Sequence, residues 1–274
     1  EISACLVGSE MCIRDSVITA CMLLPFLWML SSSFKLNKDV FGFPIQWIPK
    51  NPRWQNYVDI WTQIPLLTFV KNTVKITVVV TLLQLFTSSF AAYAFAKMQF
   101  KGKNALFLGY IATIAVPWQA YMVPQFMMMS SWHLNNTHLA IMCLQAFSAF
   151  GVFLMKQFSE GIPTEMLEAA RIDGASEART FVKIVLPMVK PGIGALAIFT
   201  FINSWNDYFM QLIMLSSTSK LTISLGIAKL QAENSTDYGL IMAGAALAAV
   251  PIIIVFLAFQ KYFTKGITMG AVKG

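Results

Sequence analysis

The chain contains several apolar runs of about 20 residues, and this feature constrains its fold more than any other. About 20 apolar residues in helical conformation span the hydrocarbon core of a bilayer. Charged residues make up only 12% of the sequence, whereas soluble domains carry about 25%. Because so few charges cannot cover a soluble surface, the sequence predicts an all-α membrane protein.

Six transmembrane helices are predicted from these runs. They cover residues 17–34, 70–96, 105–129, 139–158, 192–215 and 239–263. Pro117 and Pro124 lie inside the third of these helices, and we expect both prolines to bend it. Residues 35–69 form a predicted extracytoplasmic loop, and residues 70–263 form a five-helix core that is followed by a cytoplasmic tail at 264–274.

The first sixteen residues fit nothing that follows them. The string from Ser3 to Ser16 resembles translated adapter sequence found on assembled metagenomic reading frames. We therefore expect residues 1–16 to be foreign and to replace the true N-terminus. The alternative is an ordinary variable N-terminal tail.

The distribution of basic residues predicts the orientation in the membrane. The segments 97–104, 156–191 and 261–274 together hold eleven Lys or Arg, whereas the connections on the opposite side hold seven. Basic residues are enriched in cytoplasmic connections. We therefore expect a multi-pass protein of the bacterial inner membrane, with its charged loop and its C-terminus in the cytoplasm.

Several function classes lack a signal in this sequence. The 20 basic residues are scattered and form no stripe typical of nucleic-acid binding. The four cysteines have no metal-ligand spacing, and solvated positions explain His133 and His138 better than a metal site does. No Gly-x4-Gly-Lys-Ser/Thr phosphate loop and no catalytic Ser/His/Asp or Cys/His set is present. We expect no cofactor, no metal and no enzymatic activity in this chain itself.

One connection, residues 159–191, is charged where the rest of the chain is apolar. It carries nine charged residues between Glu160 and Lys190. Each of them would cost about 3 kcal/mol in the middle of a bilayer. The segment is therefore predicted to lie outside the membrane, between the fourth and fifth helices.

The first half of this loop predicts a short helix followed by a turn. Pro163 suits a first helical position, and Met166, Leu167 and Ala170 then fall on one face. Asp173 and Gly174 form a turn signal, because glycine readily adopts the left-handed conformation that ends a helix.

The second half predicts another helix, so that the whole loop is a helix–turn–helix. Ser176 is a good N-cap. Phe181, Ile184 and Val185 form an apolar stripe, and Pro187 is expected to end the helix.

A longer pattern runs through both predicted helices. It reads Glu168-Ala169-Ala170, three residues, Gly174, nine residues and Ile184-Val185-Leu186-Pro187. This is the EAA signature of permease subunits in ATP-binding-cassette importers, and the chain resembles that family. It is most similar to the second permease of the maltose-type, carbohydrate-uptake branch. Further matches are Pro49, Asn56-Tyr57, Asn72, Trp205-Asn206-Asp207 and the ending Gly270 to Gly274.

The resemblance implies that the charged loop is a coupling helix seated in a cleft of an ATP-binding subunit. By this resemblance, the coupling role is assigned to the residues that match the family's signature. They are Glu168, Ala169, Ala170, Asp173, Gly174, Ile184, Leu186 and Pro187. Closure of two ATP-binding subunits around ATP would move the loop as a rigid body and switch the pore between inward-facing and outward-facing states. An ordinary amphipathic connection is the alternative.

The same resemblance implies the partners and the cargo. The chain would form a heterodimeric pore with a second permease subunit. Two ATP-binding-cassette subunits and an extracytoplasmic solute-binding protein would complete an importer of a sugar, an oligosaccharide or a polyol-type solute.

A second polar constellation lies in the fifth predicted helix and comprises Asn203, Trp205, Asn206 and Asp207. An ionisable group inside a membrane helix is costly and marks a functional site by default. At about 1.5 Å per residue, Asp207 would lie roughly 22 Å from the cytoplasmic end. Two interpretations stay open. The group lines the sugar pathway, with Trp205 offering an apolar face to a pyranose ring, or it hydrogen-bonds between helices and fixes the packing of the two permeases.

Two rival functions make different demands on the sequence. An ion-gradient-driven secondary transporter would call for inverted repeats and paired charges at mid-bilayer, whereas Asp207 stands alone in its predicted helix. An integral membrane enzyme would need a cluster of ionisable residues at one depth, and no such cluster is visible. An importer permease therefore fits the sequence best.

Overall fold

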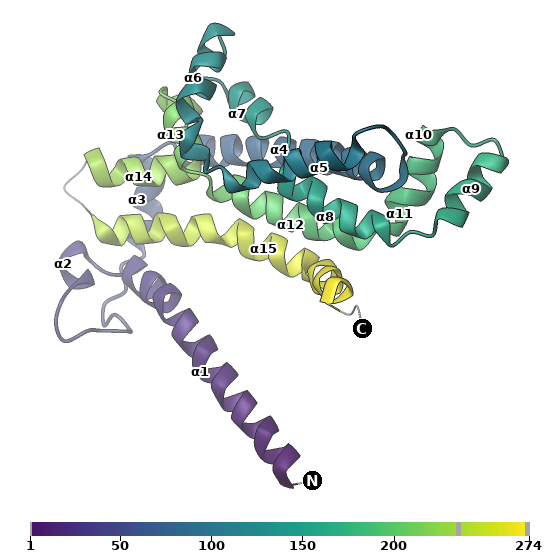
Figure 1. Ribbon diagram of the computed structural model, residues 1–274. Helices are drawn as coiled ribbons and strands as arrows, with labels where there is room; N and C mark the ends of the chain where they lie inside the picture. Colours follow the sequence, from purple (N-terminus) through teal and green to yellow (C-terminus); the bar gives the residue numbers. More distant parts are fainter. Residues whose placement is uncertain (1, 234–236, 272–274) are drawn as a thin grey trace. The chain divides into compact units, whose positions relative to one another are not determined.

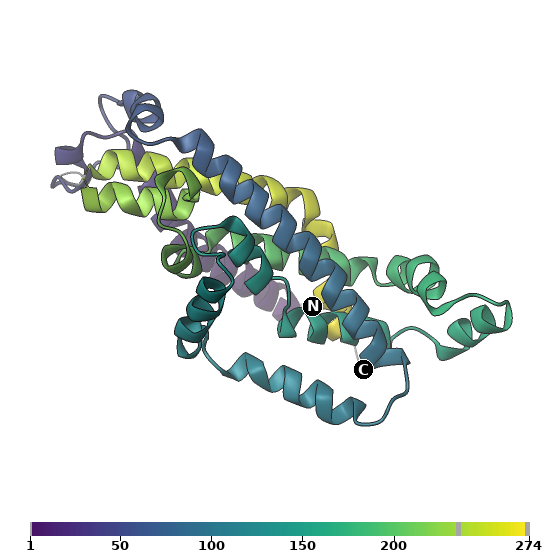
Figure 2. The same cartoon turned by 90° about the horizontal axis from the view of Figure 1, so that it is seen from above.

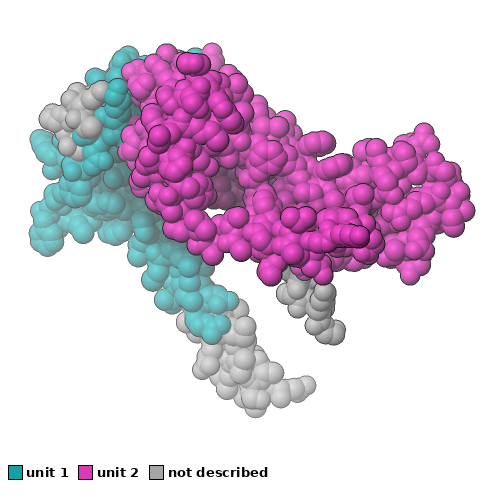
Figure 3. Space-filling model, turned by 45° about the horizontal axis from the view of Figure 1, so that its top comes forward, with its two compact units in different colours: residues 1–67, 226–251 teal, residues 68–225, 252–274 magenta. Residues whose placement is uncertain are grey.

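The computed structural model describes residues 2–233 and 237–271, with side chains over residues 14–231 and 237–261. All regular elements in this described part of the chain are helices (Figure 1). The chain divides into two units, residues 1–67 with 226–251 and residues 68–225 with 252–274 (Figure 3). Each unit is described separately.

The first unit contains α1 (Ile2–Ser33), α2 (Asn37–Val40), α3 (Gln55–Gln63), most of α14 (Ile223–Glu233) and the first part of α15 (Tyr238–Ala271). Asn56 of α3 is buried, and its amide donates to the carbonyl oxygens of Ser33 and Lys35, both at 2.9 Å. A Cβ on Gly239 would lie 2.5 Å from the Lys35 carbonyl oxygen. This close approach requires glycine at 239 and fixes the end of α1 against α3 and α15.

The second unit holds most of the remaining elements. They are α4 (Leu66–Lys97), α5 (Lys103–Ala112), η1 (Thr113–Ala115), η2 (Trp118–Ala120), α6 (Met122–Ser131), α7 (His138–Leu144), α8 (Ala149–Glu160), α9 (Thr164–Ile172), α10 (Glu177–Thr180), the π-helical turn η3 (Phe181–Val185), α11 (Leu186–Met188), α12 (Lys190–Asn206), α13 (Phe209–Met214) and η4 (Thr218–Lys220). Asn72 of α4 donates to the carbonyl oxygens of Ser219 and Leu221, at 3.0 and 2.8 Å. The helices α9 and α10 project beyond α8 and α12 in two perpendicular views (Figures 1 and 2).

Three helices in the described residues are long and apolar enough to cross a membrane. They cover Arg14–Ser33, Leu66–Lys97 and Tyr238–Lys261. Two bent pairs, α7 with α8 and α10–α11 with α12, raise the number to five if each pair counts as one span. Three of the expected helices thus correspond to uninterrupted helices, and the one at 139–158 corresponds to the bent pair of α7 and α8. The one at 192–215 overlaps α12, the second member of the other pair.

The expected helix at 105–129 differs, because the chain leaves helical geometry in its middle. Val116 has an extended backbone (φ −87°, ψ 115°) and precedes Pro117, which disfavours helical geometry at its neighbour. Pro124 does not bend the helix, because it lies in the first turn of α6, where the backbone N–H groups have no partner within the helix and proline removes no helical hydrogen bond. Only one of the two prolines therefore interrupts the segment.

The expected helices at 139–158 and 192–215 are also interrupted. The axis bends by 45° between α7 and α8. The fifth expected helix begins earlier, at Lys190, and α12 ends at Asn206, after which Asp207 is extended (φ −62°, ψ 124°). These two breaks shape the polar site described below.

The backbone shows no break at the two boundaries that the sequence predicted near the ends of the chain, after residue 16 and after residue 263. The helix α1 begins at Ile2 and continues through Val17, so the predicted foreign segment 1–16 is not set apart by its backbone from Ile2 onward. Its origin stays a prediction. At the other end, α15 extends to Ala271, which makes the predicted tail helical to that point, and residues 272–274 lie outside the described residues.

Candidate functional site

The charged loop forms a compact structure, residues 164–188, which we call the knob. Its first helix, α9, ends at the residues that the sequence indicated. Gly174 has φ +78°, and its N–H donates to the Arg171 carbonyl oxygen at 3.0 Å. The N–H of Ala175 donates to the Ala170 carbonyl oxygen at 2.9 Å. Because a left-handed backbone disfavours residues with a Cβ, this turn requires glycine at 174.

The second half of the knob begins at its predicted cap. The Ser176 hydroxyl accepts a hydrogen bond of 3.3 Å from the N–H of Arg179. The helix then widens into the π-helical turn η3, and the chain turns only after Pro187, at Val189, where the axis bends by 79°. Pro187 therefore does not end the helix as expected. The wider π turn before it gives the proline ring room that a regular helix would deny it.

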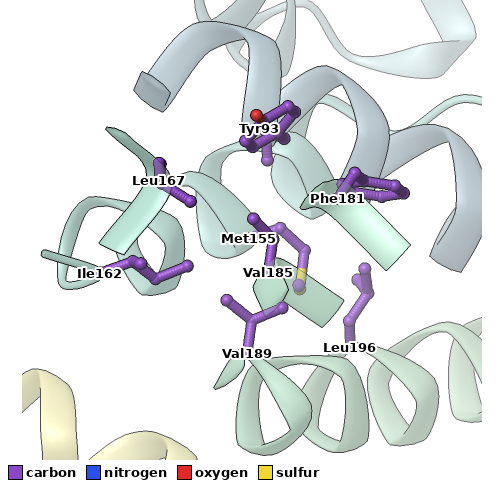
Figure 4. Packing of buried hydrophobic residues seen from close by; sticks show 9 residues of the cluster. Tyr93, Met155, Ile162, Leu167, Phe181, Val185, Val189 and Leu196 are labelled. Carbon is purple, nitrogen blue, oxygen red and sulfur yellow. The ribbon is translucent and has the colours of Figure 1, made fainter. Parts of the chain in front are cut away.

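The knob is anchored by an apolar face. Leu167 of α9 and Phe181 and Val185 of η3 are at most 5% exposed and belong to one cluster (Figure 4). The cluster also contains Ala92, Tyr93, Met155, Ile162, Val189 and Leu196. These residues come from α4, α8, the connection to α9, the bend after α11, and α12. The knob is thereby packed onto the ends of three long helices of the second unit.

A polar link reinforces this packing. The Tyr93 hydroxyl donates to a carboxylate oxygen of Glu177 at 2.5 Å, and Arg171 Nε donates to the other oxygen at 2.8 Å. These two hydrogen bonds, the one from Tyr93 first, hold the pKa of the Glu177 carboxyl below its usual value. The bond to Glu177 in turn raises the pKa of Arg171. One carboxylate therefore ties the two halves of the knob to α4.

A lysine that sequence reasoning missed secures the connection that leads into the knob. Lys97, at the end of α4, donates from Nζ to the carbonyl oxygens of Ile162 and Glu160, at 2.5 and 3.3 Å. A basic residue at the end of a predicted helix was the only signal for it. The sequence does not reveal which carbonyl groups it reaches.

The opposite face of the knob is exposed. Glu168, Ala169, Asp173 and Gly174 are exposed, and Ile172 is 86% exposed. Of the remaining signature residues, Ala170 is buried, Ile184 and Leu186 are half-buried, and Pro187 is exposed. The signature thus divides between a face that packs inward and a face that is exposed, with the apolar Ile172 on the exposed side.

The second site is a cavity of about 360 Å³ in the second unit. Its polar lining residues are Gln84, Gln145, Ser148, Thr200, Asn203, Ser204 and Asp207. Three apolar residues, Val80, Phe150 and Phe199, complete the lining. The polar residues come from α4, from the break between α7 and α8, and from the end of α12.

The cavity lies where the two helix breaks meet. Gln145 Nε2 donates to Asp207 Oδ2 at 2.7 Å, and Asp207 Oδ1 accepts from the N–H of Met210 at 3.3 Å. Gln84 and Thr87 of α4 donate to the carbonyl oxygens of Gln145 and Ala146, at 2.7 and 2.8 Å. Non-helical backbone at membrane depth must satisfy its polar groups within the protein or in a water-filled cavity. Side chains from α4 and the cavity itself meet that need.

A chain of side-chain hydrogen bonds fixes the lining. The Thr200 hydroxyl donates to Gln84 Oε1 at 3.0 Å, and the Ser204 hydroxyl lies 3.5 Å from Gln145 Oε1. Because Gln145 Oε1 accepts from Ser204, its amide nitrogen is directed at Asp207. The network therefore holds the carboxylate in place.

The four residues predicted for the pathway separate in the structure. Asn203 and Asp207 line the cavity. Trp205 is 1% exposed and stacks on Phe201, with ring centroids 5.5 Å apart, so it does not offer the expected apolar face to the cavity. Asn206 is exposed and bonds to the Ile202 carbonyl oxygen at 3.0 Å.

Sequence reasoning missed most of this lining. The apolar wall is formed by Phe150 and Phe199, whose ring centroids lie 5.0 Å apart. Gln84 and Gln145 could have been noticed as amides within apolar runs, which is a weaker form of the signal that indicated Asp207.

No group of three or more His, Cys, Asp or Glu within the described residues could hold a metal ion. The ring of His138 bonds through Nε2 to the Lys220 carbonyl oxygen at 2.8 Å.

Comparison with known proteins gives a consistent picture. A family model described as "Binding-protein-dependent transport system inner membrane component" matches residues 84–269. The chain is similar to the arabinooligosaccharides transport system permease protein AraQ of Halalkalibacterium halodurans, with 35% identity over 91% of both chains. It is also similar to the lactose transport system permease protein LacG of Rhizobium radiobacter, with 34% identity over 92% of this chain and 91% of that protein. A third relative is the melibiose/raffinose/stachyose import permease protein MelC of Bacillus subtilis, with 33% identity over 94% and 95%.

A solved structure shares the fold. The crystal structure of a bacterial ABC transporter involved in the import of the acidic polysaccharide alginate matches with a TM-score of 0.82. The match covers 96% of this chain and 98% of that one at 24% sequence identity, so it concerns the fold alone.

Proposed function

The chain belongs to the family of binding-protein-dependent transport system inner membrane components, and on that premise we propose that it forms half of a sugar-import pore driven through the knob. As a member, it is a multi-pass permease subunit of the inner membrane and works with a solute-binding protein and an ATPase. It is not itself an enzyme. Membership also removes the support for the rival ion-gradient-driven transporter.

The proposed cargo is a sugar or an oligosaccharide. The three relatives named above transport arabinooligosaccharides, lactose and the group melibiose, raffinose and stachyose, by their descriptions. All are uncharged polyhydroxyl compounds, and each relative aligns over more than nine-tenths of this chain. A cavity lined by amides and hydroxyls suits such a cargo, because these groups both donate and accept hydrogen bonds.

The knob is the proposed docking element for the ATP-binding subunit. Its inner face packs Leu167, Phe181 and Val185 into the cluster, and its outer face presents Glu168 and Ile172. A rigidly anchored element with an exposed apolar side chain can transmit motion from a partner to the helices behind it. This division of the knob into an anchored face and an open face is the observation that carries the proposal.

The proposed topology follows the sequence prediction. Six spans, a cytoplasmic coupling loop at 159–191 and a cytoplasmic C-terminus place the knob on the side where ATP is available. The interrupted segment 105–129 would count as the remaining span. A second permease subunit would complete the pore, two ATP-binding subunits would drive it, and alternating access would follow from their closure.

Reconstitution of the complete importer tests this function. The chain, its partner permease, the ATP-binding subunit and the binding protein are incorporated into proteoliposomes, and uptake of a labelled neutral oligosaccharide is measured. Uptake should require both internal ATP and the binding protein, and collapse of the proton and sodium gradients should not change it. Uptake that follows an ion gradient without ATP would contradict the proposal.

A further inference from the structure

The described lining of the cavity that contains Asp207 has an acidic residue and no basic one. Among the described residues that line it, Asp207 is the one residue with an ionisable side chain, and none is lysine or arginine. The other polar lining groups are neutral amides and hydroxyls. The cavity therefore has no basic group to compensate an acidic one.

Two effects act in opposite directions on the charge of Asp207: burial disfavours the charged form, and the hydrogen bonds around the carboxylate favour it. Both carboxylate oxygens accept from N–H donors, Oδ2 from Gln145 at 2.7 Å and Oδ1 from the backbone of Met210 at 3.3 Å. Donors directed at a carboxylate stabilise the ionised state over the protonated one. The Gln145 amide cannot turn its oxygen toward Asp207 without losing the contact with Ser204.

We propose that this cavity is a charge filter, which admits neutral polyhydroxyl solutes and excludes anionic ones through the carboxylate of Asp207. The inference deepens the proposed function and rests on it, since it names the charge class of the cargo. A cavity of about 360 Å³ lies at the low end of the range of roughly 300–1,000 Å³ typical of small-molecule sites.

The rest of the lining fits a neutral sugar. Gln84, Asn203 and Thr200 offer donors and acceptors without net charge. The rings of Phe150 and Phe199, which are 39% and 41% exposed, supply an apolar wall on which the carbon face of a sugar ring can pack. An anionic sugar would meet the same wall but would also meet uncompensated repulsion.

Coulomb's law sets the size of the effect. At a separation of about 7 Å, one unit charge changes the local concentration of a small ion roughly threefold, even at the dielectric constant of water. Cations and anions change in opposite directions, so their ratio changes roughly tenfold. A neutral probe should lie between the two.

The test measures this ratio with a cysteine inside the cavity. Asn203 is exposed and lines the cavity, and the variant Asn203→Cys is made in a chain whose native cysteines, Cys5, Cys12, Cys21 and Cys143, are replaced by serine. The complete importer in lipid nanodiscs is treated with three methanethiosulfonates, one carrying a trimethylammonium group, one a hydroxyl and one a sulfonate. Each rate is divided by the rate of the same reagent with free cysteine.

The normalised rates should fall in the order cation, neutral, anion, with the cation roughly tenfold faster than the anion. Adding Asp207→Asn should bring the three rates to within about twofold of one another, whereas Asp207→Glu, which keeps the charge, should preserve the order. As a control, a cysteine at Phe43, which is 94% exposed in the first unit, should show the same ratio with Asp207 and with Asp207→Asn.

Equal rates for the three reagents with Asp207 present would overturn the charge filter. So would a lack of any reaction at position 203 in every nucleotide state, because the cavity would then be closed to solutes. Neither result depends on whether uptake needs ATP, so the filter and the import function can fail independently.

Discussion

The side-chain amide of Gln145 donates a hydrogen bond of 2.7 Å to the carboxylate of Asp207 and so joins the break between α7 and α8 to the end of α12. Gln145 lies in the break between α7 and α8, and Asp207 lies directly after α12. Each break would leave polar groups without helical partners. Their pairing at one cavity explains why two interrupted helices are tolerated in an apolar chain.

Removing this amide should destabilise the second unit. In Gln145→Ala, the partly buried carboxylate of Asp207 loses its shorter hydrogen bond, which costs about 1–3 kcal/mol. Thermal unfolding of the purified complex, followed by tryptophan fluorescence, measures the loss. Asn206→Ala is the matched control, because the exposed Asn206 donates to the Ile202 carbonyl oxygen of its own helix, and it should change stability by at most about 0.5 kcal/mol. Equal stability of the two variants would contradict the role given to Gln145.

Tyr93 should matter for coupling more than for stability. Tyr93→Phe keeps the ring in the cluster and removes only the hydroxyl that bonds to Glu177. The knob then loses its polar tie to α4, and fewer solute molecules should be imported per ATP hydrolysed, by a factor of about 2 to 13, given a lost bond of roughly 0.5–1.5 kcal/mol. Uptake and ATP hydrolysis are measured in the same proteoliposomes. Tyr121→Phe on the exposed surface near α6 serves as the control, and an unchanged ratio in Tyr93→Phe would contradict the tie.

The link through Glu177 predicts a defined pH dependence. Because its pKa is lowered in the folded protein from the ordinary value of 4.5, its contribution to stability is present above pH 4.5 and is lost as the pH falls through the folded-state pKa. The difference in stability between the parent and Glu177→Gln should therefore be constant between about pH 8 and pH 5 and should shrink only at lower pH. Thermal unfolding across this range measures it. A difference that disappears near pH 7 would show that Glu177 is not ionised in the folded knob.

The open face of the knob predicts where a partner binds. Ile172→Asp places a charge on an 86% exposed apolar residue and should reduce co-purification of the ATP-binding subunit at least tenfold. Glu168→Lys, on the same face, should weaken it as well. Val182→Asp is the matched control, because Val182 is also on the knob and 56% exposed but lies in η3, whereas Ile172 lies in α9. Equal co-purification of all three variants would remove this face as the docking surface.

Local chemistry made part of this structure predictable. Gly174 and Ser176 end and begin helices through their own backbone preference and side chain, so neighbouring residues suffice to find them. The break at Val116 follows equally from Pro117. By contrast, the break after Leu144 depends on Gln84 and Thr87, which lie some 60 residues earlier and satisfy the freed carbonyl groups.

The lining of the cavity was also less predictable, because it too depends on packing between distant parts of the chain. Trp205 was the obvious aromatic candidate, yet it is buried, and Phe150 and Phe199 take the place expected for it. Which face of a helix turns to a cavity depends on tertiary packing, and an apolar helix gives little periodicity from which to infer it. Asp207 was found because a charge in an apolar run is conspicuous by itself.

The central claim, that the knob transmits the action of ATP, is tested most directly by a pair of glycine variants. Gly174 and Gly102 have nearly identical backbones, φ +78° and +79°, and neither has a heavy atom within 4 Å of an added Cβ. Valine at either position introduces a similar backbone strain of about 1–2 kcal/mol, but only Gly174 lies in the knob. ATP-driven uptake is measured in proteoliposomes with equal amounts of membrane-inserted protein. Gly174→Val should abolish uptake while Gly102→Val retains most of it, and equal uptake by the two variants would contradict the claim.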